Sequence, residues 1–250
     1  MAEPALALTA LRKSFGALVV TDDLSLSIEP GELHAVIGPN GAGKTTLINQ
    51  ISGLLLPDSG SIRFAGRDIT TMPAHARAKL GLARSFQVTS VLSGFSALEN
   101  VALAVQAHSG SSFRVVGDAA REEALNAPAR AALAEVGLAD RADVPAGHLA
   151  HGEKRALELA IALAADPKLL LLDEPMAGTG REETARLIAV LKKLKGRFAI
   201  MLVEHDMTAV FALADRISVM IYGHIVASGT PDAVRADPQV VAAYLGDEME

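Results

Sequence analysis

The sequence contains no cysteine and no tryptophan, and aromatic residues make up only 4% of its 250 residues. The lack of cysteine excludes disulfide bonds and thiol chemistry, and it is typical of proteins in a reducing compartment. Because aromatic side chains are so few, alanine and leucine must supply most of the buried surface, which favours helices packed on a sheet. The sequence also lacks any apolar stretch near the ~18 residues that a membrane span needs.

The net charge and the first residues of the sequence indicate the cellular location and the class of partner. The start of the chain contains Glu3 and Pro4 and has no basic segment followed by an apolar core, so we expect no signal peptide. The formal net charge is −6, which disfavours a nucleic-acid partner because phosphate-binding surfaces carry a basic excess. We therefore expect a soluble, cytosolic protein with one large domain or a domain with an inserted subdomain.

The pattern G-x-x-x-x-G-K-[ST] is typical of loops that wrap the phosphates of a nucleoside triphosphate. It matches the segment Gly38-Pro39-Asn40-Gly41-Ala42-Gly43-Lys44-Thr45-Thr46. A buried strand is predicted before it, at Leu33–Ile37, and a helix after it, at Thr45–Ile51. Glycines let backbone N–H groups approach the phosphates, and the helix N-terminus adds roughly half a positive charge. Lys44 would reach the terminal phosphates and the Thr45 hydroxyl would bind Mg²⁺, so we expect ATP or GTP binding.

Periodicity along the chain predicts an α/β fold. Residues 5–34 alternate apolar and polar positions, as half-exposed strands do, whereas residues 96–165 have helical periodicity with a loop at 109–117. Further elements are expected as strands at 60–64, 169–172 and 198–203, a helix at 182–194, a hairpin of 216–222 and 224–227, and short helices starting at Thr230-Pro231 and Asp237-Pro238. Apolar strands that alternate with helices indicate a parallel sheet covered on both faces, interrupted by a helical insertion of about 70 residues.

Two adjacent carboxylates, Asp173 and Glu174, follow four consecutive leucines and precede Pro175. A buried strand would deliver them to its C-terminal edge, where ligands of open α/β sheets bind. Strand side chains alternate between faces, so the two carboxylates would have different roles. We expect Asp173 to hold Mg²⁺ and Glu174 to point at the water that attacks the γ-phosphate. The alternative is a strand that simply ends in two solvated acids, which the upstream phosphate loop disfavours.

A third segment runs from Leu149 to Arg155 and leads into an amphipathic helix. Alone, it would be read as an ordinary loop and helix start. The order of the motifs changes that interpretation. A phosphate loop, Gln87, this segment, Leu-Leu-Asp-Glu-Pro and then Val203-Glu204-His205-Asp206 together resemble the ATP-binding-cassette (ABC) ATPase family, from about Leu8 to Ala227.

The resemblance implies a fold and a domain organisation. The fold would be a P-loop NTPase core of parallel sheet with helices on both faces, an N-terminal antiparallel β subdomain and an inserted α-helical subdomain. Residues 1–250 would form a single ABC ATPase domain. Its core would cover about 1–87 and 166–228, its helical subdomain about 88–165, and a helical tail 229–250.

The resemblance also implies roles for residues that mean little in isolation. Phe15 would stack on adenine, although an aromatic in such a strand is more often core. Gln87 would meet Mg²⁺ and the attacking water, and His205 would contact the γ-phosphate, although a histidine after a strand is more often a cap or surface residue. The family signature would contact ATP held by a second subunit, through Leu149, Ala150, His151, Gly152 and Glu153.

The sequence departs from the family pattern at two places. Ala150 replaces the usual signature serine, and His151 stands where many relatives have glycine. A lost hydroxyl that donates to phosphate removes a hydrogen bond to a charged group, worth about 1.5–3 kcal/mol. Gly180 stands where an aspartate usually crosses the dimer interface. Both departures weaken the inference of two equivalent, highly active sites in a homodimer.

Within the family, the chain resembles the ATP-binding subunits of importers for branched-chain amino acids, urea and amides. The similarity lies in His151–Arg155, Asp173–Gly178, the loop and helix within 106–134, Gly229-Thr230-Pro231 and Ala243–Gly246. It implies a peripheral location on the inner face of the membrane, with two integral-membrane permeases, a second ABC ATPase subunit and, indirectly, a solute-binding protein as partners.

The docking groove for the permeases would lie near Gln87 to Glu99. Five apolar residues are candidates to face this groove: Val88, Val91, Leu92, Phe95 and Leu98. Burial in the protein core explains their apolar character equally well. Two other functions stay open. One is the ATPase of a lipid or polysaccharide exporter. The other is a non-transport cassette that acts on DNA or ribosomes or senses ATP, which the acidic charge and the presence of Glu174 and His205 disfavour.

Overall fold

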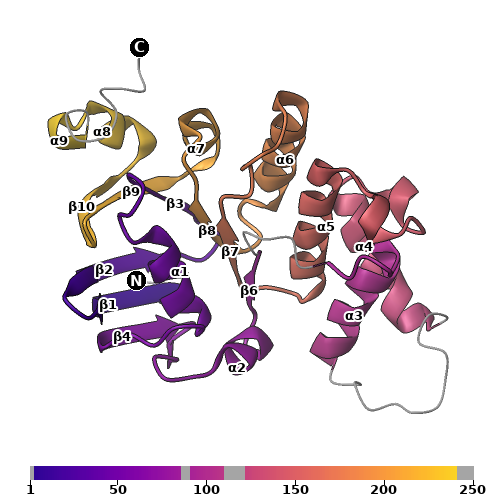
Figure 1. Ribbon diagram of the computed structural model, residues 1–250, viewed down its shortest axis with the longest axis horizontal. Helices are drawn as coiled ribbons and strands as arrows, with labels where there is room; N and C mark the ends of the chain where they lie inside the picture. The colour runs from indigo at the N-terminus through magenta and orange to yellow at the C-terminus, as the bar shows by residue number, and fades with distance from the viewer. Residues whose placement is uncertain (1–2, 86–90, 110–121, 241–250) are drawn as a thin grey trace. The chain divides into compact units, whose positions relative to one another are not determined.

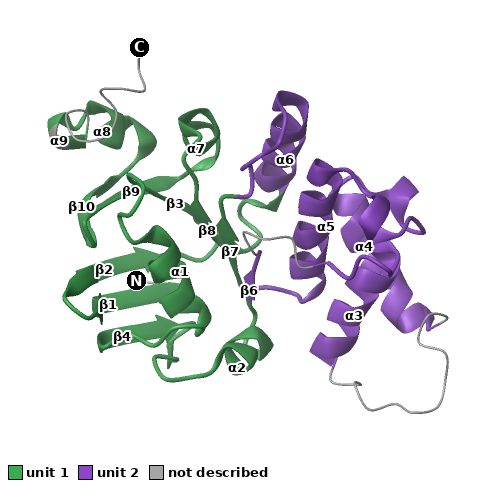
Figure 2. Cartoon of the chain, viewed as in Figure 1, with its two compact units in different colours: residues 1–82, 168–174, 194–250 green, residues 83–167, 175–193 purple. Residues whose placement is uncertain are grey.

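The computed structural model describes residues 3–85, 91–109 and 122–240. The chain divides into two compact units, shown in green and purple in Figure 2. Unit 1 comprises Met1–Leu82, Lys168–Glu174 and Leu194–Glu250, and unit 2 comprises Ala83–Pro167 and Pro175–Lys193. The segment Pro175–Lys193, which the sequence placed in the core, therefore groups with the helical unit.

One sheet of unit 1 is antiparallel and four-stranded, in the order β2-β1-β4-β5. Its strands are β1 (Leu6–Phe15), β2 (Leu18–Ile28), β4 (Ser59–Phe64) and β5 (Arg67–Asp68). Leu8 pairs with Leu26 on one side and with Ile62 on the other, and all three side chains are buried. The alternation of apolar and polar residues thus places one face of this sheet on the core, as predicted.

The second sheet has the order β10-β9-β3-β8-β7-β6. Its strands are β3 (Leu33–Ile37), β6 (Leu82–Arg84), β7 (Leu169–Asp173), β8 (Ala199–Val203), β9 (Arg216–Ile221) and β10 (His224–Gly229). β9, β3, β8 and β7 run parallel, and β10 returns antiparallel to β9 as a hairpin. Every residue of β3, β7 and β8 is buried, which is expected of parallel strands covered on both faces. The predicted α/β fold is confirmed.

Helix α1 (Lys44–Ser52) packs between the two sheets, as Figure 1 shows. Leu47, Ile48 and Ile51 share one hydrophobic core with side chains of both sheets, such as Leu11 and Val36. The other helices of unit 1 are α2 (Ala74–Lys79), α7 (Met207–Leu213), α8 (Pro231–Ala236) and α9 (Pro238–Val240). The sequence did not indicate α2 or α7, because six or seven residues give too short a periodic signal.

Unit 2 is helical. Helices α3 (Ala97–Ser109), α4 (Glu123–Glu135) and α5 (His151–Ala164) pack on one another. Two short turns, η2 (Ala139–Arg141) and η3 (Ala146–His148), lie between α4 and α5. Most of α6 (Arg181–Leu194) also belongs here. Its first turn approaches the first turn of α5 so closely that a Cβ added to Gly152 would overlap the carboxylate of Glu183. Among the described residues, no helix is long and apolar enough to cross a bilayer.

Candidate functional site

The predicted site residues of unit 1 meet at one edge of the parallel sheet. Val203, the last residue of β8, pairs with Val36 of β3 on one side and with Asp173 of β7 on the other. The three strands therefore end together. This register brings the phosphate loop after β3, the Asp173-Glu174 pair and the segment after Val203 to the same edge, although they are far apart in the sequence.

At two positions of the phosphate loop, the backbone conformation and the close approach of neighbouring atoms require glycine, apart from any ligand. Gly38 and Gly43 have φ values of 152° and 107°, which favour glycine. A Cβ at Gly38 would overlap the carbonyl oxygen of Met220 in β9. A Cβ at Gly43 would lie 2.5 Å from the carbonyl oxygen of Val20 in β2. Both sheets thus hold the loop in its shape.

Lys44 begins α1, and its ammonium group turns back onto the loop. Nζ donates hydrogen bonds to the carbonyl oxygens of Gly38 at 2.6 Å and Pro39 at 3.0 Å. Burial lowers the pKa of Lys44, and the negative charges of Glu174 and Asp173 oppose that shift. The cation and the helix N-terminus lie together, as phosphate binding needs.

Asp173 and Glu174 differ in burial and in backbone conformation, and their different roles stay a prediction. Asp173 ends β7 and is 1% exposed, whereas Glu174 is half-buried. Glu174 has φ 47° in the left-handed region, and its N–H donates to the carbonyl oxygen of Val203 at 2.8 Å. For a residue other than glycine, such a conformation costs on the order of 1–3 kcal/mol. The strand ends at Asp173, so strand alternation does not set the direction of the Glu174 side chain.

The oxygen donors near the loop fit a magnesium ion that is bound together with a nucleotide. The described residues contain no group of three or more His, Cys, Asp or Glu side chains that could hold a metal by themselves. Mg²⁺ commonly takes one or two carboxylates, substrate phosphates and water. The Asp173 carboxylate and the Thr45 hydroxyl are oxygen ligands of that type.

Glu204 is a residue whose role the sequence analysis missed. It is fully buried, and its Oε2 accepts hydrogen bonds from the backbone N–H of His205 at 2.8 Å and of Asp206 at 3.3 Å. The same oxygen lies 3.5 Å from His205 Nδ1. Glu204 thus fixes the turn that presents His205, whose side chain is 58% exposed. A carboxylate directly after five apolar residues was the available signal.

Phe15 lies at the end of β1 with 52% of its surface exposed. Its exposure excludes the alternative of a core aromatic, and its stacking on adenine stays a prediction. Lys13 Nζ lies 5.7 Å from the centre of the ring. An exposed ring beside a cation can offer a face to a purine base and a charge to its phosphates.

The signature segment lies in unit 2 and begins α5. Ala150 is the N-cap residue, and its N–H donates to Glu153 Oε2 at 2.9 Å. Glu153 Oε1 accepts from Arg141 Nε at 2.8 Å. The hydrogen bond from Ala150, and then Arg141, hold the pKa of Glu153 below its ordinary value of 4.5, while burial opposes this. Alanine offers no side-chain oxygen to the first turn, so only the reciprocal half of a capping box forms.

The rest of the signature and the neighbouring loops have distinct settings. Leu149 is buried, whereas His151 is exposed and lies next to Gly178, at 3.3 Å from the position of a Cβ there. Leu92 and Phe95 are 50% and 44% exposed, whereas Leu98 is buried. Gln87, Val88 and the tail segment Ala243–Gly246 lie outside the described residues.

Comparison with known proteins identifies families for two parts of the chain. Residues 21–177 match the family described as ABC transporter. Residues 224–250 match the family described as branched-chain amino acid ATP-binding cassette transporter.

The chain is also similar to named relatives over nearly its whole length. It is 37% identical to the high-affinity branched-chain amino acid transport ATP-binding protein BraF of Pseudomonas aeruginosa, covering 99% of this chain and 100% of that protein. It is 36% identical to LivG of Escherichia coli, a protein of the same description, with the same coverage.

Among solved structures, a nucleotide-free ATP-binding cassette from an ABC transporter superposes with a TM-score of 0.84 at 28% identity, covering 97% of this chain and 99% of that one. The ADP conformation of an ATP-binding cassette of an ABC transporter superposes with the same TM-score and identity, covering 98% of this chain and 100% of that one. The resemblance inferred from the motifs is confirmed. The chain belongs to the ABC transporter family of ATP-binding cassettes.

Proposed function

We propose that the chain binds and hydrolyses ATP as the ATP-binding subunit of an importer for branched-chain amino acids or related small polar solutes. The observation that carries the proposal is the register of the parallel sheet, which ends the phosphate-loop strand, the Asp173 strand and the His205 strand at one edge. The similarity to BraF and LivG over nearly the full chain supports the class of solute.

Nucleotide binding rests on the loop from Gly38 to Thr46. Backbone N–H groups of the loop and the N-terminus of α1 would take the β- and γ-phosphates, and Lys44 would exchange its contacts with the carbonyl oxygens of Gly38 and Pro39 for phosphate oxygens. Phe15 would stack on the adenine from the exposed end of β1.

Hydrolysis would use the carboxylates at the sheet edge. Asp173 and Thr45 would hold Mg²⁺, which neutralises charge on the phosphates when bound, and Gln87 would reach the same ion. Glu174, turned by its left-handed backbone, would orient and deprotonate the attacking water, and His205 would contact the γ-phosphate. Glu204 would keep His205 in place through the backbone.

A second cassette would complete each site. In this arrangement Leu149 to Glu153 face ATP bound to the partner subunit. Since both carboxylate oxygens of Glu153 are already engaged within unit 2, its contribution would be to hold the turn rather than to bind phosphate. The missing hydroxyl at Ala150 would make that contact weaker, by about 1.5–3 kcal/mol if no other donor replaces it.

Transport would require two integral-membrane permeases and, indirectly, a solute-binding protein, with the cassette held at the inner face of the membrane. Leu92 and Phe95 support a docking surface because both large apolar side chains are exposed. Asn100 holds their loop, accepting from the N–H of Leu92 at 2.8 Å and donating to the carbonyl oxygens of Leu92 and Ser96.

Glu174→Gln tests the catalytic assignment. We expect ATP binding to persist while turnover falls by about 10²–10⁴-fold, because the shape remains but the base is lost. The ATP-bound dimer should then accumulate and elute as a larger species in size exclusion. The exposed Glu182→Gln serves as the control. Turnover equal to that of this control would remove Glu174 from the catalytic role.

The solute class is tested by reconstituting the chain in proteoliposomes with the permease subunits and the solute-binding protein of a branched-chain amino acid importer. We expect ATP-dependent accumulation of leucine in proteoliposomes, abolished by Glu174→Gln. Export of a lipid or polysaccharide by the same complex would favour the alternative function.

A further inference from the structure

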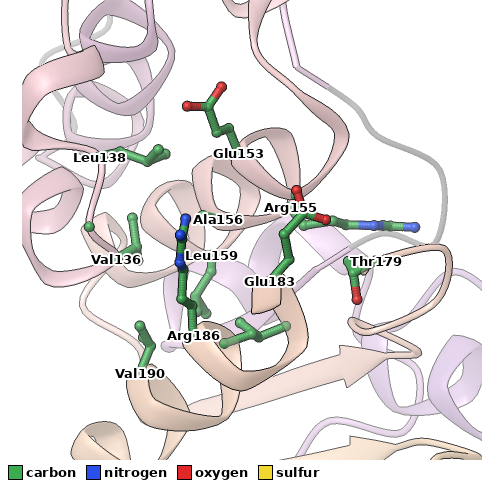
Figure 3. Close-up of a pocket in the computed structure, with 13 residues that line it drawn as sticks. Val136, Leu138, Glu153, Arg155, Ala156, Leu159, Thr179, Glu183, Arg186 and Val190 are labelled. Carbon is green, nitrogen blue, oxygen red and sulfur yellow. The ribbon is translucent and has the colours of Figure 1, made fainter. Parts of the chain in front are cut away.

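Unit 2 contains a small cavity between α5 and α6, shown in Figure 3. Its volume is about 120 Å³. Aliphatic side chains from three elements form its wall: Val136 and Leu138 after α4, Ala156 and Leu159 on α5, and Leu187 and Val190 on α6. Val136, Leu138 and Leu159 are themselves buried, so this wall continues the packed interior of the unit.

Two charged side chains of α6 border the apolar wall. Glu183 and Arg186 are three residues apart and so lie on the same face of the helix, one turn from each other. In Figure 3 they stand on opposite sides of Ala156 and Leu159. Among the described residues no ion pair joins these two side chains, and both line the cavity together with Arg155 of α5.

Each of these charges has spare capacity for a ligand. Glu183 Oε2 accepts from the Gly180 N–H at 3.2 Å, and no described residue donates to its Oε1. Within the described part of the chain, Arg186 has only an ion pair of 3.8 Å with Glu182, and the two side chains are 80% and 90% exposed. Such an exposed pair contributes little. The other carboxylate of the cavity, Glu153, is already held by Ala150 and Arg141.

We propose that this cavity is a binding site for an aliphatic α-amino acid. Arg186 would bind the α-carboxylate, Glu183 Oε1 would bind the α-ammonium group, and the side chain would enter the apolar wall. A cavity of ~150 Å³ accommodates benzene, so one of 120 Å³ suits a smaller branched alkyl group such as that of leucine or valine. A neutral hydrocarbon would leave both charges unused, and an acidic amino acid would bury its second carboxylate against Val136 and Leu138.

The location gives the site a consequence. Gly152 and Glu153, at the start of the signature helix, line the same cavity. A ligand held by Glu183 would constrain the side chain that lies against Gly152. The binding step itself needs neither ATP nor a second subunit. ATP affinity is therefore measured in the same samples. Normal ATP binding without leucine binding would refute this proposal alone, whereas absent ATP binding would refute the proposed function.

The test is calorimetric or NMR titration of the full chain with L-leucine. We expect saturable binding with a dissociation constant on the order of 1 mM. Alanine should bind about 10-fold more weakly or worse, because it lacks the methylene and methyl groups that the wall would bury. Arg186→Gln and Glu183→Gln should each weaken leucine binding about 10-fold or more. Arg181→Gln, which removes a charge from the same helix outside the cavity, should leave it unchanged.

A second comparison does not depend on the folding of any variant. Isocaproate is leucine without its ammonium group, and isopentylamine is leucine without its carboxylate. Both should bind the unaltered protein at least about 10-fold more weakly than leucine, and Glu183→Gln should not weaken isocaproate further. The proposal is overturned if leucine binding does not saturate at leucine concentrations about 10-fold above the expected dissociation constant. Equal binding of alanine, or leucine affinity that is indifferent to both variants, would overturn it as well.

Discussion

Arg77 on α2 is fully buried, and its guanidinium holds the C-terminal end of α1. Nη1 donates to the carbonyl oxygens of Gln50 and Ile51, both at 2.7 Å. Nε donates to Met72 at 2.7 Å and Nη2 to Thr70 at 3.0 Å. A cation at the negative end of a helix is favourable, because the last carbonyl oxygens of a helix lack part of their usual backbone partners.

We predict that the substitution Arg77→Met lowers the free energy of unfolding, by an amount that follows from these contacts. Each hydrogen bond from a charged donor contributes about 1.5–3 kcal/mol, and a buried acceptor without its donor costs about 1–3 kcal/mol. Burial of the guanidinium opposes this gain, as the lowering of the pKa of Arg77 by desolvation shows. The Gln50 carbonyl oxygen also accepts from the Gly53 N–H at 3.3 Å, so it keeps one hydrogen bond when the guanidinium is removed. We expect a net loss of about 3–5 kcal/mol of unfolding free energy.

Urea denaturation followed by circular dichroism measures this loss. Lys79→Met, at an exposed position on the same helix, is the matched control and should change stability by less than about 0.5 kcal/mol. Arg77→Lys should fall between the two, because an ammonium group keeps the charge but reaches fewer of the four carbonyl oxygens. An Arg77→Met protein within about 1 kcal/mol of wild type would refute the reasoning, since it would mean that water satisfies these oxygens equally well.

Three further predictions concern the site. Lys44→Ala should lose nucleotide binding in a fluorescence titration, because it deletes the cation on the phosphate loop; unchanged affinity would count against that assignment. Glu153→Gln should cost stability at neutral pH, and the difference from wild type should shrink as the pH falls below 4.5 through the lowered pKa of Glu153; a constant difference would contradict the hydrogen bond from Ala150. Ala150→Ser should raise ATPase activity or ATP-driven dimerisation in the assembled complex, and no change in either would show that the missing hydroxyl is already compensated.

Motifs built from neighbouring residues could be predicted from the sequence alone. The phosphate loop, the Asp173-Glu174 pair and the strands β3, β7 and β8 were predicted because each depends on neighbouring residues and on local periodicity. Their order along the chain was enough to indicate the family, and with it the fold. The cap at Thr230 also belongs to this class, since its hydroxyl accepts from the nearby Ala233 N–H at 3.3 Å.

Contacts between distant segments were decided by the tertiary structure. Arg77 would be expected on a surface from its type, yet packing of α2 against the end of α1 buries it. The sheet register pairs Asp173 with Val203, and the Glu174 N–H donates to the Val203 carbonyl oxygen directly after the strand. Pro175–Lys193 groups with the helical unit, where Glu183 lies against Gly152 and a cavity lies between α5 and α6. Local patterns specify elements, but partners far apart in sequence are chosen by shape and burial, which no short pattern contains.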